Sequence, residues 1–278
     1  MVDQYRLERL VAWGGMASIF RAIDTKSGQT VALKIPHARD RRALEQCRLE
    51  SEILARCGHP HLVRKLPATE TNRDYLVLEW LDGRPLRSVL DECGFLAAEH
   101  AIRISLAICD ALEHLHGCGV VHCDLKPENV MVSPEGNIKL IDFATAADLN
   151  AKWWRWGRMN REGGSPDYAS PDRAAGKRAG PHADLYSLGV VLFEMLTGEL
   201  PFSGVDPHTA MTLRLSLDAP GVRELNPHLS ERLEGIVARA LARNRVERYL
   251  TVRAMRADLA KALSEESVAS APVLSNVG

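Results

Sequence analysis

Residues 122–129 read His-Cys-Asp-Leu-Lys-Pro-Glu-Asn and follow a long amphipathic segment that ends at Gly117 to Gly119. The glycines predict that residues 122–129 form a loop. Asp124, Lys126 and Asn129 bring a proton acceptor, a cation and a metal-capable amide together in this loop. The combination suits a hydroxyl nucleophile, a charged phosphate and a divalent cation, and argues against a charged loop that only faces solvent.

A second acidic group follows at the end of an apolar strand. Residues 138–144 read Ile-Lys-Leu-Ile-Asp-Phe-Ala, which places Asp142 where the predicted strand ends. A carboxylate there can hold a hard cation such as Mg²⁺. Taken alone, Asp142 could also be a strand-end cap.

Two upstream segments point to a phosphate group. Lys34 ends the apolar strand run Val31-Ala32-Leu33, and burying its charge needs a partner. The helix that follows offers three glutamates, Glu45, Glu50 and Glu52. A lysine that points to solvent is the alternative. In the turn at residues 11–20, small residues let backbone amides approach a phosphate, although an ordinary hairpin turn explains them as well.

The four segments occur in the order used by protein kinases. The chain resembles the eukaryotic-like serine/threonine protein kinases over roughly residues 5–262, and its Trp-Gly-Gly-Met turn looks most like the bacterial members. The resemblance implies an α+β, bilobal kinase domain over residues 1–265. A small antiparallel-sheet N-lobe (about 1–80) with one main helix, a hinge (about 79–84) and a larger, mainly helical C-lobe (about 85–265) precede a flexible tail (266–278).

The resemblance also implies roles for single side chains. Asp124 matches the base that accepts the substrate hydroxyl proton, and Lys126 matches the residue that steadies the γ-phosphate. Lys34 matches the lysine that contacts the α- and β-phosphates. Glu50 matches its helix partner, because it lies ten residues before Pro60 of the His-Pro pair. Asn129 and Asp142 match the metal ligands, so the implied cofactors are ATP and Mg²⁺, with Mn²⁺ as an alternative metal.

A nucleotide site follows from the same resemblance. Leu78 stands at the gatekeeper position, and Glu79 to Leu81 form the adenine-binding hinge. Gly14 and Gly15 belong to the turn over the phosphates. The residues that would sandwich the adenine ring are Val11, Ile19, Ala32 and Met131. Those four are also plausible as plain core residues.

The substrate region resembles that of protein kinases as well. Residues 164–168, Gly-Ser-Pro-Asp-Tyr, look like the loop that docks the substrate peptide, and Ser165 stands where many members have threonine. Asp172 replaces the glutamate of the usual Ala-Pro-Glu and is expected to form a buried ion pair with Arg248. Asp184 matches the helix aspartate that supports the catalytic loop. The Asp-Leu-Lys-Pro-Glu-Asn string is the serine/threonine form.

Four positions depart from the family's pattern. Ala12 and Ala17 replace glycines of the nucleotide turn, Ala144 replaces the glycine of Asp-Phe-Gly, and Cys123 replaces the arginine of His-Arg-Asp. Alanine is tolerated where φ stays negative, and otherwise costs about 1 kcal/mol or more. We therefore expect weaker nucleotide binding, not its loss. Since the missing arginine usually receives a phosphorylated activation loop, we hypothesise that activity does not depend on loop phosphorylation.

The segment Trp153-Trp154-Arg155-Trp156 allows two interpretations. A loop packed on its own lobe is one, and a docking site for a partner or substrate is the other, because Trp and Arg are favoured in binding hot spots. The departures above support a second functional hypothesis, a pseudokinase that acts as a nucleotide-binding or interaction module. A small-molecule phosphotransferase on a related fold is a third, against which the protein-type substrate loop argues.

Composition excludes several other classes. The net charge of −1 lacks the basic excess of a nucleic-acid binder. The six cysteines show no zinc-binding spacing and are interpreted as reduced thiols. The longest apolar stretch, Leu188 to Leu196, is about half the length that crosses a bilayer. We therefore expect a cytoplasmic protein with a protein substrate, no nucleic-acid partner and no membrane insertion.

Hydrophobic patterning predicts the elements that carry these motifs. Strands are expected at Tyr5–Val11, Ser18–Asp24, Gln29–Ile35, Leu62–Leu66 and Tyr75–Trp80. Helices are expected at Arg41–Cys57, Ala97–His116, Tyr186–Leu196, Ser230–Ala242 and Thr251–Leu263, with a loose tail from about Ser264.

Overall fold

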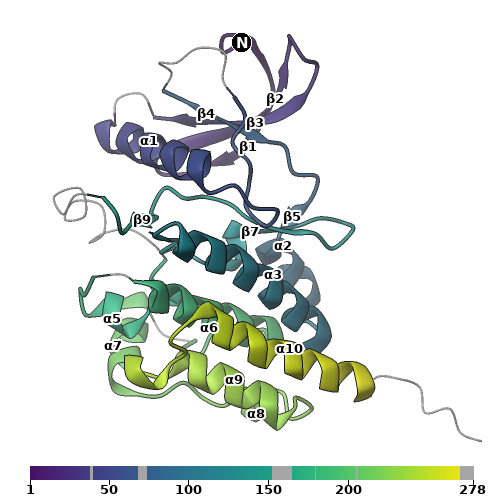
Figure 1. Ribbon diagram of the computed structural model, residues 1–278, viewed down its shortest axis with the longest axis vertical. Helices are drawn as coiled ribbons and strands as arrows, with labels where there is room; N and C mark the ends of the chain where they lie inside the picture. Colours follow the sequence, from purple (N-terminus) through teal and green to yellow (C-terminus); the bar gives the residue numbers. More distant parts are fainter. Residues whose placement is uncertain (38–39, 68–73, 152–164, 179, 204–205, 270–278) are drawn as a thin grey trace, which may run out of the picture.

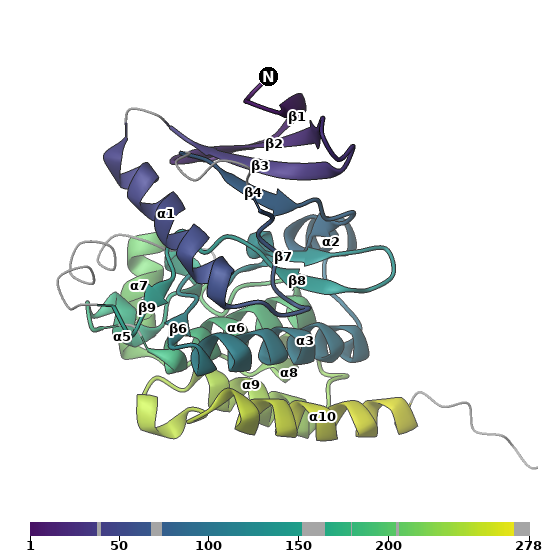
Figure 2. The ribbon, with the colours of Figure 1, turned by 45° about the horizontal axis from the view of Figure 1, so that its top comes forward.

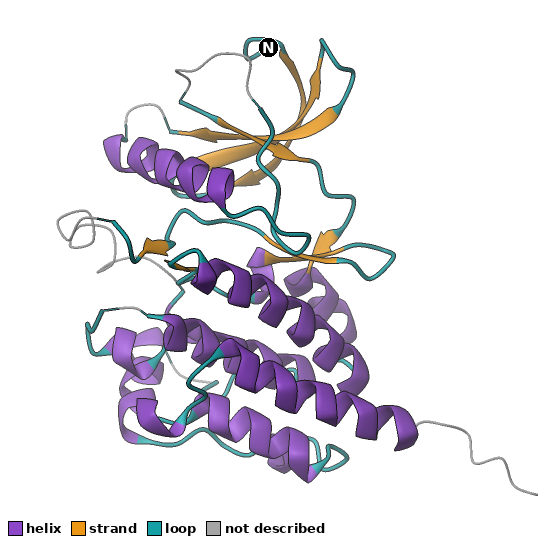
Figure 3. Ribbon diagram, in the orientation of Figure 1, coloured by secondary structure: helices purple, strands orange, loops and turns teal. Residues whose placement is uncertain are grey.

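The computed structural model describes residues 1–37, 40–67, 74–151, 165–178, 180–203 and 206–269. An N-terminal sheet and one long helix stand above a larger helical part (Figures 1 and 3). The predicted α+β architecture, with a small antiparallel-sheet lobe and a mainly helical lobe, is therefore confirmed.

The N-lobe sheet has four antiparallel strands in chain order. They are β1 (Tyr5–Trp13), β2 (Ala17–Asp24), β3 (Thr30–Pro36) and β4 (Leu76–Glu79). Alternation along β3 gives the sheet two different faces, since Val31 and Leu33 join a small core while Ala32 packs against the main core. Lys34 therefore leaves the sheet on the same face as Ala32.

Helix α1 (Arg41–Arg56) begins at Asp40, whose side chain accepts hydrogen bonds from the backbone N–H groups of Arg42 and Ala43. Its buried face includes Leu49, Glu50 and Ile53. Figure 2 shows α1 running from beside the sheet toward the helical part. This course carries Glu50 to the junction of the two lobes.

The C-lobe is built around α6 (Pro181–Thr197), which is buried from His182 to Leu196. A helix that is apolar on all sides belongs in the centre of a core. The other helices are α2 (Leu86–Cys93), α3 (Ala98–Gly117), α5 (Pro171–Ala174), α7 (Pro207–Ser216), α8 (Val222–Leu225), α9 (Glu231–Leu241) and α10 (Val252–Ala269). Helices α3 and α9 pack on α6, and α10 packs on α3.

Short strands between residues 84 and 148 shape the loops of the site. One sheet joins β5 (Arg84–Pro85), β7 (Val130–Val132) and β8 (Ile138–Leu140), and another joins β6 (Val120–Val121) and β9 (Ala147–Asp148). The short 3₁₀ helices are η1 (Pro127–Asn129), η2 (Pro166–Tyr168) and η3 (Arg245–Glu247). The loop at residues 122–126 lies between β6 and η1, as its glycine-bounded sequence predicts.

Three expectations about elements were wrong. Helix α6 begins at Pro181, before the expected start at Tyr186. Residues 62–66 form no strand but an extended segment with isolated bridges from Leu62 to Leu140 and from Lys65 to Leu78. At one end the segment pairs with β4, since Leu66 N–H donates to the main-chain oxygen of Val77 and Glu79 N–H donates to that of Arg64. At the other end Leu62 bridges to Leu140 of β8, so the segment is divided between the two lobes. The last helix runs to Ala269, past the expected end at Leu263, so the loose tail was placed too early. Residues 270–278 lie outside the described part of the chain.

Candidate active site

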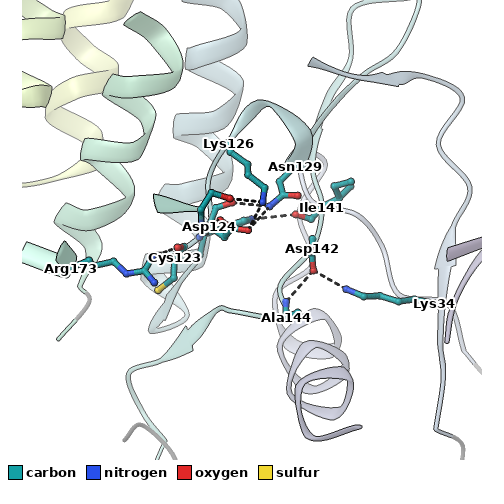
Figure 4. Close-up of polar contacts among 11 residues, drawn as sticks. Lys34, Cys123, Asp124, Lys126, Asn129, Ile141, Asp142, Ala144 and Arg173 are labelled. Carbon is teal, nitrogen blue, oxygen red and sulfur yellow. Dashed lines mark hydrogen bonds and ion pairs between the residues drawn. The ribbon is translucent and has the colours of Figure 1, made fainter. Parts of the chain in front are cut away.

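Asp124 is the centre of a polar network between the loop at residues 122–129 and the segment after residue 164 (Figure 4). Its Oδ1 accepts a hydrogen bond from the backbone N–H of Ser165 at 2.7 Å. Its Oδ2 lies 3.0 Å from Lys126 Nζ, which also donates to Ser165 Oγ at 2.6 Å. The loop therefore holds a carboxylate, an ammonium and a serine hydroxyl within hydrogen-bonding reach of one another.

Asn129 fixes the loop from inside. It is 5% exposed, and its Nδ2 donates to the main-chain oxygen of Asp124 at 2.8 Å and to Asp124 Oδ2 at 3.2 Å. Both hydrogen bonds use the amide nitrogen, which leaves the amide oxygen as an acceptor. The backbone of Asn129 in turn accepts from Ile141 N–H at 2.9 Å, which ties the loop to the strand that ends before Asp142.

Lys34, Glu50 and Asp142 form a charged triad across the lobe junction. Lys34 Nζ lies 2.6 Å from Glu50 Oε2 and 2.8 Å from Asp142 Oδ1. Burial alone would lower the pKa of Lys34, but the two carboxylates outweigh it and raise that pKa. Complete burial raises the pKa of Glu50 despite the neighbouring ammonium. Burial would also raise the pKa of Asp142, but the neighbouring ammonium of Lys34 holds the pKa of this carboxyl below its usual value.

The choice among the three glutamates of α1 is settled by burial. Glu50 is 0% exposed and faces Lys34, whereas Glu45 and Glu52 lie on the exposed side of the helix. The second oxygen of Glu50 accepts a hydrogen bond from the backbone N–H of Phe143 at 3.1 Å. The same glutamate therefore fixes the lysine and the start of the segment after Asp142.

Phe143 is completely buried and packs against the ring of His122, with 5.0 Å between ring centroids. His122 Nε2 lies 3.3 Å from the main-chain oxygen of Ile141, and its Nδ1 accepts from Asp124 N–H at 3.3 Å. This pattern fits a neutral imidazole with its proton on Nε2. His122 thus links the backbones that carry the two aspartates.

The donor set suits a divalent cation shared with phosphate groups. Asp142 receives its two hydrogen-bonding contacts, from Lys34 and from Ala144 N–H, on Oδ1, and its side chain is 43% exposed. No group of three or more His, Cys, Asp or Glu side chains among the described residues could hold a metal by itself. Mg²⁺ is commonly bound by one or two protein oxygens plus substrate phosphates, so Asp142 and Asn129 fit such an ion.

Asp184, near the start of α6, supports the loop from below. Its Oδ2 accepts from His122 N–H and its Oδ1 from Cys123 N–H, both at 2.9 Å. His116 Nε2, from the end of α3, lies 2.9 Å from the same Oδ2. Burial would raise the pKa of Asp184, but these hydrogen bonds and the nearby imidazoles hold that pKa below its usual value.

The residues predicted to line the nucleotide site lie on β1, β2, β3, β4 and β7. Strand pairing places Ile19 opposite Lys34 and Ala32 opposite Leu78. Leu78 is 7% exposed, whereas Val11 is exposed on β1. The remaining members are Gly14 and Gly15 in the β1–β2 turn, Glu79 and Leu81 at and beyond the end of β4, and Met131 on β7.

The three alanines that replace family glycines are not strained. Among the described residues, positive φ outside glycine occurs only at Asp3, Cys123 and Asp142. Ala12 and Ala17 lie in β1 and β2, and Ala144 follows the Asp142-Phe143 pair. The condition under which alanine is tolerated is therefore met at all three positions.

The predicted ion pair between Asp172 and Arg248 is present. Arg248 Nη1 donates to Asp172 Oδ2 at 2.8 Å, and the guanidinium also donates to the main-chain oxygens of Ala242 and Arg243. Arg248 is 1% exposed and lies over the ring of Tyr186. The ion pair and the two hydrogen bonds to main-chain oxygens satisfy this buried charge and attach α5 to the C-lobe.

Several residues of the site were not predicted from the sequence. Arg173 donates to the main-chain oxygen of Cys123, and His116 binds Asp184. A buried cluster joins Tyr168 Oη to Glu194 Oε2 at 2.7 Å and Arg87 to Glu194 Oε1. Long-range polar pairs of this kind leave no periodic signal, although Glu194 inside an otherwise apolar helix pattern was a hint. The Trp153–Trp156 segment lies outside the described residues.

Fold and site together define a protein kinase. The family model described as "Protein kinase domain" matches residues 5–259, so the chain belongs to this family. Such a domain implies ATP as phosphoryl donor and protein as acceptor.

The chain is similar to several curated bacterial proteins. The chain is 34% identical, over 94% of its length, to a probable serine/threonine-protein kinase PknB of Lactococcus lactis. It is 32% identical over 98% to a protein of the same name from Corynebacterium glutamicum, and 32% identical over 95% to the serine/threonine-protein kinase PrkC of Bacillus subtilis. It covers 42%, 44% and 41% of these three relatives, respectively, so it spans less than half of each. Within the described part of the chain, no helix meets the length and hydropathy of a membrane span.

Proposed function

We propose that this domain transfers the γ-phosphoryl group of Mg-ATP to serine or threonine hydroxyls of proteins. The observation that carries the proposal is the continuous set of contacts from Lys34 and Glu50, through Asp142, to the loop of Asp124, Lys126 and Asn129. Kinase chemistry requires both the lysine–glutamate pair and the metal-binding aspartate in place. The contacts of Lys34 with Glu50 and with Asp142 support this proposal.

Each side chain has one task in this proposal. Asp124 accepts the proton of the substrate hydroxyl as its oxygen attacks the γ-phosphorus, while the bond from the γ-phosphorus to the β–γ bridging oxygen breaks and ADP leaves with that electron pair. Lys126 neutralises charge on the transferred group. Lys34, held by Glu50, binds the α- and β-phosphate oxygens. Asp142 and Asn129 would hold Mg²⁺, which would screen the charge of the phosphates when bound.

The contacts of Ser165 support a hydroxyl acceptor beside Asp124. Ser165 Oγ already accepts from Lys126 Nζ, and its backbone N–H donates to Asp124. The start of the substrate segment is thereby joined to the base. A serine or threonine hydroxyl that enters beside Ser165 comes within reach of both Asp124 and Lys126. The Asp-Leu-Lys-Pro-Glu-Asn string supports the same acceptor class.

We also propose that activity does not require phosphorylation of the activation loop. Cys123 replaces the arginine that would bind such a phosphate, and its side chain packs in a small apolar cluster with Val121 and Ala147. Burial raises the pKa of its thiol, so the side chain carries no charge at neutral pH. The loop at residues 122–126 is instead held by protein groups. Asp184 accepts from the N–H groups of His122 and Cys123, and Arg173 donates to the main-chain oxygen of Cys123.

A pseudokinase is the alternative function, and it rests on Ala12, Ala17, Ala144 and Cys123. The absence of positive φ at the three alanines weakens that argument, because none of them is held in the left-handed region that favours glycine. Association of a partner with Trp153–Trp156 and function in the cytoplasm stay proposals. The free thiols of all six cysteines are compatible with a reducing compartment.

The test is phosphoryl transfer by the purified chain, with Mg²⁺, labelled ATP and a generic basic protein as acceptor. We expect transfer by the wild type and a rate lower by roughly 10²–10⁴-fold in Asp124→Asn, which keeps the shape but loses the base. Nucleotide binding, measured by thermal shift, should persist in both proteins. Binding without transfer by the wild type would instead favour the pseudokinase.

A further inference from the structure

The backbone of Cys123, directly before the proposed catalytic base, adopts a conformation that needs support. Its φ of 67° lies in the left-handed region, which a side chain with a Cβ disfavours. Such strain persists only where surrounding contacts determine the conformation. Because the peptide unit between Cys123 and Asp124 sets the direction in which Asp124 leaves the loop, these contacts matter for the base.

The two polar groups of Cys123 are held from opposite sides. Its N–H donates to Asp184 Oδ1 at 2.9 Å, from α6 in the core. Its carbonyl oxygen accepts a hydrogen bond from Arg173 Nη1, which comes from α5 (Figure 4). The first contact matches a role already implied by the sequence pattern. The contact between Arg173 and the carbonyl oxygen of Cys123 was not implied by the sequence pattern.

Helix α5 holds the backbone of Arg173 in a fixed position. Ser170 caps the helix by accepting from Arg173 N–H at 3.4 Å, and Asp172 is bound by the buried Arg248 at 2.8 Å. The helix follows the substrate segment, whose Ser165 already contacts Asp124. Arg173 therefore connects the far end of that segment to the residue next to the base.

The charge of Arg173 makes the contact stronger than a neutral hydrogen bond and independent of a phosphate. A guanidinium is charged at every physiological pH, and hydrogen bonds from charged donors are roughly twice as strong as neutral ones. The side chain at position 123 is an uncharged thiol in an apolar cluster. A positive charge thus reaches this point of the catalytic loop from α5.

We propose that Arg173 is a positioning residue for the catalytic base: through the carbonyl oxygen of Cys123 it holds the loop that carries Asp124 and joins this loop to the substrate segment. The inference rests on the proposed kinase function. Family members that have an arginine in place of Cys123 use that arginine, bound to a phosphate, to hold this loop. In this protein Arg173 holds the loop instead.

The test compares Arg173→Met with the wild type and with Arg253→Met. Methionine keeps the length of the aliphatic stem but removes the donor and the charge. Arg253 is a matched control, because its side chain is 86% exposed on α10 and pairs only loosely with Glu113, at 3.5 Å. The kcat and the KM for ATP are measured at saturating acceptor, with thermal denaturation to report the folded fraction.

We expect kcat of Arg173→Met to fall about tenfold or more, since hydrogen bonds to charged groups contribute about 1.5–3 kcal/mol. The KM for ATP should stay within about twofold, because Lys34 and the hinge are untouched. Arg253→Met should match the wild type in both. A kcat for the folded fraction of Arg173→Met within twofold of the wild type would overturn the proposal and reduce Arg173 to a structural contact.

Amide hydrogen exchange separates this inference from the proposed function. If the wild type transferred no phosphate, the function would fail, but exchange at residues 122–126 would still report on Arg173. Faster exchange there in Arg173→Met, with unchanged exchange in α6, is the expected result. Equal exchange at residues 122–126 in both proteins would contradict the positioning role.

Discussion

Two of the described non-glycine residues with positive φ, Cys123 and Asp142, stand next to or at the proposed chemical groups. Strained backbone of this kind costs on the order of 1–3 kcal/mol per residue and concentrates at functional sites. In both cases neighbours hold it, with Asp184 and Arg173 around Cys123 and Lys34 in contact with Asp142. The positions of the carboxylates of Asp124 and Asp142 are thus set by the main chain as well as by side-chain rotamers.

The variant Ala144→Gly tests whether alanine suits the position after Phe143. Since Ala144 has no positive φ, glycine brings no relief there and adds freedom to the unfolded chain and to other conformations of the segment. We expect the free energy of unfolding in urea to fall by roughly 0.5–1 kcal/mol. A rise in stability would show that Ala144 is strained in the wild type.

At the scale of elements, the buried helix α6 is the platform of the catalytic loop. Its Asp184 accepts hydrogen bonds from two consecutive backbone N–H groups, of His122 and Cys123, and from the ring of His116. In Asp184→Asn the amide nitrogen would face one of these donors. We expect the free energy of unfolding to fall by about 2–4 kcal/mol at neutral pH, because a buried donor loses its acceptor.

The loss should depend on pH, because the pKa of Asp184 is lowered in the folded state. A carboxyl of this kind stabilises the fold above its unfolded pKa, about 4, and loses that contribution as the pH falls through its lower folded value. The difference in unfolding free energy between the wild type and Asp184→Asn should therefore be constant near neutral pH and shrink below about pH 4. A difference that grew on acidification would contradict this assignment.

The elements show what the sequence could and could not predict. Strands and helices with clear periodicity, such as β3 and α1, were predicted nearly to their ends, because one face of each is apolar. The extended residues 62–66 were misassigned as a strand, since their backbone bridges to Leu140 at one end and to β4 at the other, instead of pairing along one sheet. Motif residues such as Lys34, Glu50 and Asp124 were found because their order along the chain is characteristic. Arg173 and Glu194 were missed because their partners lie far away in the sequence.

At the scale of the whole molecule, polar contacts join the two lobes around the proposed nucleotide site. Lys34 and Glu50 come from the N-lobe, and they bind Asp142 and the N–H of Phe143 in the C-lobe. Lys139 Nζ on β8 lies 2.6 Å from Glu79 Oε1 at the end of β4. A ligand that binds both Lys34 and Asp142 would add to these contacts and stabilise the two lobes together.

Mg-ATP should therefore raise the melting temperature of the chain. At one hundred times the dissociation constant the gain is about 2.7 kcal/mol, which corresponds to several degrees for a chain of this size. In Lys34→Met the ligand-induced rise should be largely lost, whatever the melting temperature of the variant itself. An equal rise in Lys34→Met and the wild type would show that the nucleotide binds without the lysine.

The central claim is an active site that protein contacts alone hold ready for phosphoryl transfer. The most direct test is the initial rate of transfer to a basic protein after treatment of the wild type with phosphatase, with removal of phosphate verified by intact mass and the phosphatase then removed. We predict that the rate stays within about twofold of the untreated protein, while Asp124→Asn stays inactive under both conditions. Loss of activity on dephosphorylation, with nucleotide binding intact, would contradict the claim and show that a phosphate assembles the site.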